Sequence, residues 1–263
     1  MTLLDHTMMR VTDLDRAVDW YRAHIGLEEL GRWEAKTFTN LYLSPPDRSD
    51  EGAMLELTYN HDGRDYTSGD AWSHIALRVS DLETTIESLR SRGVEVTWPM
   101  RGEEPRAAVT DPDGHQLELV EQTVGAESSL AWTAVETGNL DQAIGWYVHK
   151  FGLMPTEQSE SAGRVYCDLQ PAGASDQAMS LRLIETDNVQ TVGDSWGHIS
   201  FRVSDLISDL WPTLMARGAA DYRSPEECAP FDYEGTTTGI RHTTGLYAFT
   251  KDPDGRQIEL LEV

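Results

Sequence analysis

The chain has 263 residues, 45 of them Asp or Glu and 21 Lys or Arg, which gives a formal net charge of −24 at pH 7. This length suits two domains, and a hydrophobic content of 39% excludes wholesale disorder. The acidity argues against nucleic acid and membrane surfaces as partners, because both carry negative charge. No apolar run reaches the ~20 residues of a membrane span, the N-terminal residues do not resemble a signal peptide, and two cysteines exclude a disulfide framework. We therefore expect a cytoplasmic protein.

Lysine is scarce among the basic residues, and the excess of acidic residues is divided equally between the two halves of the chain. The lysines are Lys36, Lys150 and Lys251. An ordinary acidic protein is one interpretation. We favour a halophilic source with a salty cytoplasm, where ions screen the repulsion between like charges.

The first 121 residues predict two similar units. Each begins with a short strand, near 7–11 and 74–79, that leads to an Asp able to cap a helix. Apolar residues then recur at helical spacing in residues 14–21 and 82–89. Three strands are expected after each helix, near 28–33, 38–43 and 54–59 in the first unit and near 94–98, 106–109 and 116–120 in the second. Asp-Pro-Asp-Gly at 111–114 is typical of a turn.

The second half of the chain repeats the first. Residues 69–82 return as 193–206 with ten of the fourteen positions identical, and 14–21 and 111–121 return as 140–147 and 252–262. We predict domains at 1–121 and 131–263, joined by a linker at 122–130. The fold class is α+β, with four βαβββ modules forming two cupped mixed sheets. Pro212 predicts a kink or a late start in the last helix.

Histidine and glutamate recur at equivalent module positions. His6 and His74 lie on the first strands of their modules, and Glu56 and Glu118 lie on the last. Singly, such residues are more typical of strand ends than of ligands. A His and a Glu from each of two modules would bring two nitrogens and two oxygens to one point, which suits Ni²⁺, Co²⁺, Zn²⁺ or Fe²⁺.

Residues 5–16, 55–60, 74–77 and 111–119 resemble bacterial glyoxalase I (lactoylglutathione lyase) over nearly all of 4–121. The wider vicinal-oxygen-chelate superfamily resembles the second half too. The resemblance implies a lyase that isomerises the hemithioacetal of methylglyoxal and a thiol to a lactoyl thioester. It also implies a metal in a His/Glu/His/Glu set, most often Ni²⁺, with Co²⁺, Zn²⁺, Mn²⁺ or Fe²⁺ as alternatives. Arg10 and Asn60 match positions that hold glutathione in that family.

The second half departs from this pattern. Trp132 occupies the position equivalent to His6, and Arg182 the position equivalent to Glu56, each 126 residues later. The counterparts of His74 and Glu118 are unchanged in type, as His198 and Glu259. If the halves pair as the two subunits of dimeric glyoxalase I do, His6 and Glu56 meet His198 and Glu259. The other cup then holds the alternative pair, His74 and Glu118, opposite Trp132 and Arg182, whose fixed positive charge excludes a metal. We predict one working and one degenerate site.

The resemblance also implies roles in catalysis. Glu259 is the expected base with Glu56 as its partner, and Arg241 in loop 235–242 is a candidate for binding the substrate carboxylate. One rival is an extradiol-type Fe(II) dioxygenase using His6, His74 and Glu118, and another is a non-enzymatic small-molecule-binding protein. We expect the thiol to be glutathione, as the resemblance implies, or γ-glutamylcysteine in a halophilic host. We expect the chain to be a monomer with internal domain pairing or a homodimer.

Overall fold

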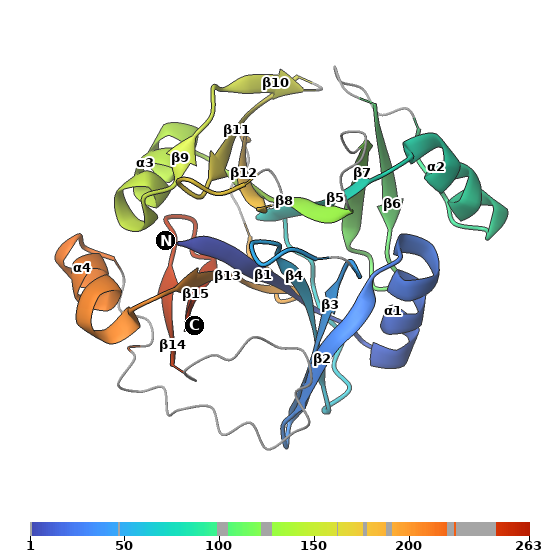
Figure 1. The fold of residues 1–263 in the computed structure, drawn as a ribbon, viewed down its shortest axis with the longest axis horizontal. Coiled ribbons are helices and arrows are strands. Elements are labelled where there is room, and N and C mark those ends of the chain that lie inside the picture. The colour runs from blue at the N-terminus through green and yellow to red at the C-terminus, as the bar shows by residue number, and fades with distance from the viewer. Residues whose placement is uncertain are drawn as a thin grey trace.

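The computed structural model describes residues 2–46, 48–98, 105–121, 128–161, 163–175, 178–187, 191–219, 224 and 246–263. The strands form two mixed sheets, with the helices at the periphery of the molecule (Figure 1). Most of the predicted linker 122–130 and all of loop 235–242, with Arg241, lie outside the described residues. The described end of that linker is not an irregular segment, because a strand begins at Ser129.

The seven-stranded sheet combines the first module with the last and has the order β14-β15-β13-β1-β4-β3-β2. Its strands are β1 (Leu3–Arg10), β2 (Glu28–Glu34), β3 (Phe38–Ser44), β4 (Met54–Asn60), β13 (Trp196–Val203), β14 (Tyr247–Lys251) and β15 (Gln257–Glu262). β1 pairs antiparallel with β13 and parallel with β4. Strands from the two ends of the chain therefore lie side by side at the centre of one sheet.

The eight-stranded sheet combines the two middle modules in the order β10-β11-β12-β8-β5-β7-β6, with β9 paired to β11. Its strands are β5 (Trp72–Val79), β6 (Arg106–Thr110), β7 (Gln116–Glu121), β8 (Ser129–Thr137), β9 (Met154–Pro155), β10 (Ser159–Ser161), β11 (Arg164–Gln170) and β12 (Ser180–Glu185). Here β5 and β8 form the antiparallel contact between the halves. Each sheet thus contains one module from each half of the chain, joined through an antiparallel pair of their first strands.

The helices begin at the same place in each module because the same type of residue caps them. They are α1 (Leu14–Trp20), continued by the π-helical turn η1 (Tyr21–Ile25), α2 (Leu82–Ser91), α3 (Leu140–Phe151), and the π-helical turn η2 (Leu206–Leu210), continued by α4 (Trp211–Ala216). The side chains of Asp13, Asp81, Asn139 and Asp205 each accept a hydrogen bond from the backbone N–H three residues later. A kink or a late start was predicted at Pro212; the helical segment instead begins at Leu206, as in the other modules, and Pro212 lies in the first turn of α4, where the π-helical turn η2 gives way to the α-helix.

One predicted strand is wrong. Residues 94–98 form a single bridge, Thr97 to Ala108, beside β6 and no named strand. The Asp-Pro-Asp-Gly turn is confirmed, because the N–H of Gly114 donates to the carbonyl of Asp111 and Gly114 has a φ of 93°. No helix among the described residues is long and apolar enough to cross a membrane.

The two sheets are held against each other by symmetric contacts. Trp72 and Trp196, at the starts of β5 and β13, stack with 5.1 Å between ring centroids. The chain approaches β5 and β13 through Gly69 and Gly193, where an added Cβ would lie 2.2 Å from the carbonyl oxygen of Thr191 and 2.4 Å from that of Thr67. This close crossing fixes the positions of β5 and β13 and of the histidines on them.

Candidate metal centre

The first half supplies a buried His–Glu pair from neighbouring parallel strands. His6 is on β1 and Glu56 is on β4, where Glu56 is the partner of Met8 in the register. The two side chains are each 2% exposed, and Oε2 of Glu56 lies 2.8 Å from Nε2 of His6. Adjacent strands thus bring a nitrogen and an oxygen donor together in the interior of the sheet.

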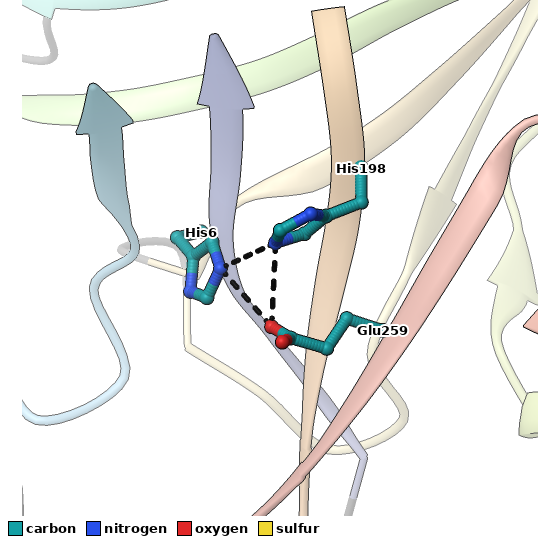
Figure 2. A group of neighbouring side chains, drawn as sticks. All are labelled: His6, His198 and Glu259. Atoms are coloured by element: carbon teal, nitrogen blue, oxygen red, sulfur yellow. Dashed lines mark hydrogen bonds and ion pairs between the residues drawn. The ribbon is translucent and has the colours of Figure 1, made fainter. Parts of the chain in front are cut away.

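The second half supplies the matching pair to the same place. His198 is on β13 and Glu259 is on β15, with 3.4 Å between Nε2 and Oε2. Because β13 pairs with β1, both second-half side chains reach His6. Nε2 of His6 lies 3.0 Å from Nε2 of His198 and 3.2 Å from Oε2 of Glu259. Glu56 completes the group, with its Oε2 3.6 Å from Nε2 of His198. Figure 2 shows His6, His198 and Glu259 pointing toward one another from three strands.

The two histidines and the two carboxylates of this group stabilise each other's charged forms. Burial alone would lower the pKa of His6, but the charge of Glu56 and hydrogen bonds to Asp5, Glu259 and Glu56 raise it well above its usual value. Burial likewise would raise the pKa of Glu56, whereas His6 and His198 hold it at about 2. Two carboxylates in a nearly dry space are favourable only with positive charge beside them.

The donor set fits a divalent ion of intermediate softness. The ligand atoms of His6, His198 and Glu259 lie within 4.8 Å of one another, and all three residues are buried. Two imidazole nitrogens with carboxylate oxygens are a set that binds Ni²⁺, Co²⁺, Zn²⁺ or Fe²⁺. The group can therefore exchange the protons that neutralise it for a metal ion.

Arg10 and Asn60 lie at the ends of the adjacent parallel strands β1 and β4. Nη1 of Arg10 donates to the carbonyls of Asp194, at 2.7 Å, and Trp196, at 3.2 Å, so this side chain bridges the two halves. Nδ2 of Asn60 donates to the hydroxyl of Tyr66 at 2.8 Å. The two candidate substrate residues thus share the edge at which β1 and β4 end, whereas Arg241 cannot be placed.

The eight-stranded sheet brings together the equivalent residues but forms a different centre. Nε1–H of Trp132 donates to Nε2 of His74 at 3.0 Å, and Oε2 of Glu118 lies 3.1 Å from the same nitrogen. The guanidinium of Arg182 stacks on Trp132 at 3.7 Å from the ring centroid. The nitrogen that would bind a metal is therefore already hydrogen-bonded, beside a fixed cation.

Arg182 is held by contacts on both sides. Its Nε and Nη2 donate to the two carboxylate oxygens of Asp168 at 2.7 and 2.8 Å, and Tyr166 packs on the guanidinium at 4.3 Å. Glu118 has a second cation in Arg106, at 3.5 Å. Charge in this cup is balanced by the protein itself.

The residue set expected for a dioxygenase is divided between the sheets. His6 is in the seven-stranded sheet, whereas His74 and Glu118 are in the eight-stranded sheet, in contact with each other and with Trp132. The structure thus groups His6 with the second-half residues His198 and Glu259.

Sequence reasoning missed Asp5, whose Oδ2 lies 2.9 Å from Nδ1 of His6. Alternation along a strand would place neighbours on opposite faces, so adjacency in the sequence argued against this contact. The available signal was the carboxylate next to His6 in the sequence, because a histidine that binds a metal often donates its other ring N–H to a carboxylate.

Comparisons with known proteins find relatives in sequence and in fold. The Glyoxalase/Bleomycin resistance protein/Dioxygenase superfamily matches residues 3–119. The lactoylglutathione lyase of Haemophilus influenzae is 38% identical over 122 residues, covering 44% of this chain and 90% of that protein. The lactoylglutathione lyase GLX1 of Arabidopsis thaliana is 27% identical over 212 residues, covering 76% and 74% of the two chains. The crystal structure of glyoxalase I from Zea mays aligns over 100% of this chain and 92% of that one, with a TM-score of 0.84 at 22% identity.

Proposed function

Because the chain belongs to the glyoxalase superfamily, in the family of the lactoylglutathione lyases, we propose that it isomerises the hemithioacetal of methylglyoxal and a small thiol to the lactoyl thioester. The observation that carries this proposal is the convergence of His6 and Glu56 with His198 and Glu259. One chain supplies all four donors, so we propose that a monomer is sufficient for activity.

The metal ligands in this proposal are His6, Glu56, His198 and Glu259. A divalent ion held there would stabilise negative charge on the two adjacent oxygens of the substrate. Ni²⁺ is our first choice, and Co²⁺, Zn²⁺, Mn²⁺ and Fe²⁺ suit the same donors.

Glu259 is the proposed base. Burial would raise the pKa of its carboxyl, but His198 and His6 hold that pKa well below its usual value, so the carboxylate is ionised. Its side chain is 11% exposed against 2% for Glu56, which makes it the more accessible carboxylate. Glu259 takes the proton from the carbon that bears sulfur and delivers it to the neighbouring carbon. The hydroxyl proton of the first carbon passes to the oxygen of the second, so the reaction is an isomerisation that gains and loses no atoms.

Arg10 and Asn60 are the proposed contacts to the thiol, glutathione or γ-glutamylcysteine. The guanidinium offers a charged donor for a carboxylate and the amide offers both a donor and an acceptor. We propose a cytoplasmic enzyme adapted to high salt, consistent with the net charge of −24.

The test is thioester formation from methylglyoxal and each thiol, in high salt, after loading the metal-free chain with Ni²⁺ or Co²⁺. We expect His198→Ala to abolish the activity and its structural counterpart His74→Ala to keep it. Loss in His74→Ala alone would move the site to the other sheet. Thioester formation absent with every metal and thiol would contradict the proposal.

A further inference from the structure

His6 has a carboxylate partner at its second ring nitrogen. Nδ1 lies 2.9 Å from Oδ2 of Asp5, while Nε2 faces the other three candidate ligands. A neutral imidazole carries one N–H, and the nitrogen that bears it cannot bind a metal. With Nδ1–H donated to Asp5, the lone pair of Nε2 is directed at the site.

A β-bulge makes this contact between neighbouring residues possible. In the pairing of β1 with β13, Leu4 is opposite Phe201 and His6 is opposite Ser200, so Asp5 is the extra residue of β1. A bulge interrupts the strict alternation of side chains and redirects those beside it. Asp5 can therefore contact the ring of the residue that follows it.

Asp5 is in turn held by Arg202 of the other half. Nε of Arg202 lies 2.8 Å from Oδ1 of Asp5, and each side chain is 3% exposed. This contact is an ion pair without the alignment of a hydrogen bond. Nη1 of Arg202 donates to the carbonyl of Asp50 at 2.8 Å, which fixes the guanidinium. Two opposite charges thus compensate each other in the interior, and together they immobilise the carboxylate.

The other sheet has the same backbone without the carboxylate. In the pairing of β5 with β8, Ala76 is opposite Trp132 and Leu77 is opposite Leu130, so Ala131 is the extra residue of that bulge. Arg78, the counterpart of Arg202, donates from Nη1 to Oγ of Ser129 at 3.3 Å. The bulge residue is thus a carboxylate, Asp5, where a histidine follows it. It is an alanine, Ala131, where the histidine is replaced by Trp132.

We propose that Asp5 and Arg202 form a positioning pair that sets the tautomer and orientation of His6, and that the metal affinity of the site depends on this pair. The inference rests on the role of His6 as a ligand in the proposed function. It adds two residues that touch neither metal nor substrate.

The experiment is a titration of the metal-free chain with Co²⁺, followed by visible absorption, which reports the ligand field directly. Asp5→Asn keeps the shape of the side chain and removes its charge. The double variant Asp5→Ala/Arg202→Met removes both buried charges together, so no unpaired charge can unfold the protein. Arg78→Met is the matched control in the other sheet, and circular dichroism checks the fold of each variant.

We expect the dissociation constant for Co²⁺ to rise about 10- to 100-fold in Asp5→Asn and in the double variant, with a changed absorption spectrum, and to stay at the wild-type value in Arg78→Met. Folded variants of Asp5 that bind Co²⁺ with the wild-type constant and spectrum would overturn the inference alone. A wild-type chain that takes up no Co²⁺ would instead contradict the proposed function.

Discussion

The two cups of this molecule share one backbone and differ in how they balance buried charge. In the seven-stranded sheet, His6, His198, Glu56 and Glu259 face one another with carboxylates that need a cation. In the eight-stranded sheet, the guanidinium of Arg182 lies among the equivalent residues and is paired with Asp168. Arg182 is a permanent positive charge within its cup. In the other cup, the positive charge has to come from protons or a metal ion taken up from solution.

Two substitutions account for this difference. Where the first cup has His6, the second has Trp132, which donates to His74 instead of offering a lone pair. Where the first has Glu56, the second has Arg182, stacked on Trp132. His74 and Glu118 remain in contact at 3.1 Å, but they face a hydrogen-bond donor and a guanidinium in place of two further ligands. The identity of the other two decides whether the cup demands a cation or excludes it.

We expect the largest difference in activity between the cups when their equivalent carboxylates, Glu259 and Glu118, are each replaced. Glu259→Gln keeps an oxygen donor but cannot accept a proton, so thioester formation should fall about 10³-fold, the typical contribution of a general base. Glu118→Gln changes the equivalent position of the other cup and should keep the wild-type rate. Steady-state assays of both variants with equal metal content make the comparison, and equal losses in the two would show that the cups act together.

The degenerate cup should matter for stability rather than activity. Arg182→Ala leaves Asp168 without the guanidinium that it contacts at 2.7 and 2.8 Å, and it removes the stacking on Trp132. We expect a loss of about 3 kcal/mol in the free energy of unfolding, measured by denaturant titration, with an unchanged turnover number.

The control for this variant is Arg182→Ala/Asp168→Ala, which removes both charges. It should recover part of the lost stability, because the cost of an unpaired charge disappears. A large drop in turnover in the single variant would mean that the second cup takes part in catalysis.

The pH dependence of the metal-free chain should reveal the charge imbalance of the first cup. Glu56 has a pKa of about 2 in the folded chain against an ordinary 4.5, so its stabilising contribution is complete above pH 4.5 and is lost as the pH falls toward 2. His6 has a raised pKa, so its contribution is complete below pH 6.5 and is lost as the pH rises through the folded value. Stability should therefore be greatest between about pH 4.5 and 6.5, with about 3 kcal/mol lost on the acid side as Glu56 is protonated.

Urea titrations of the metal-free chain across this pH range measure the profile. Glu56→Gln should flatten the acid side, and saturation with Ni²⁺ should move the maximum to higher pH, because the metal replaces the protons on His6 and His198. A profile that Ni²⁺ leaves unchanged would argue against a metal at these residues.

The sequence predicted the modules because they are repeated in it, whereas the pairing of one half with the other was expected only from the resemblance to dimeric glyoxalase I. The caps at Asp13, Asp81 and Asp205 and the turn at 111–114 depend on local chemistry that residue types reveal. The segment 94–98 was mispredicted because its apolar residues contact the core while its backbone makes a single bridge. The contact of Asp5 with His6 depends on a bulge set by the pairing with a strand almost 200 residues away, and no residue near Asp5 in the sequence indicates that bulge.

The smallest expected change, and the sharpest test of the comparison, is the metal content of a chain whose second cup is rebuilt. Trp132→His and Arg182→Glu restore the ligand types at the two altered positions, and Asp168→Asn removes the charge that Arg182 balanced. Because His74 and Glu118 already contact each other in the shared backbone, we expect bound Ni²⁺ to rise from one to two ions per chain, measured by elemental analysis after dialysis. His6→Ala in the rebuilt chain should return the content to one. If the rebuilt chain folds and still binds a single ion, ligand identity does not suffice, and the bulge residue Ala131, where the working cup has Asp5, becomes the next difference to restore.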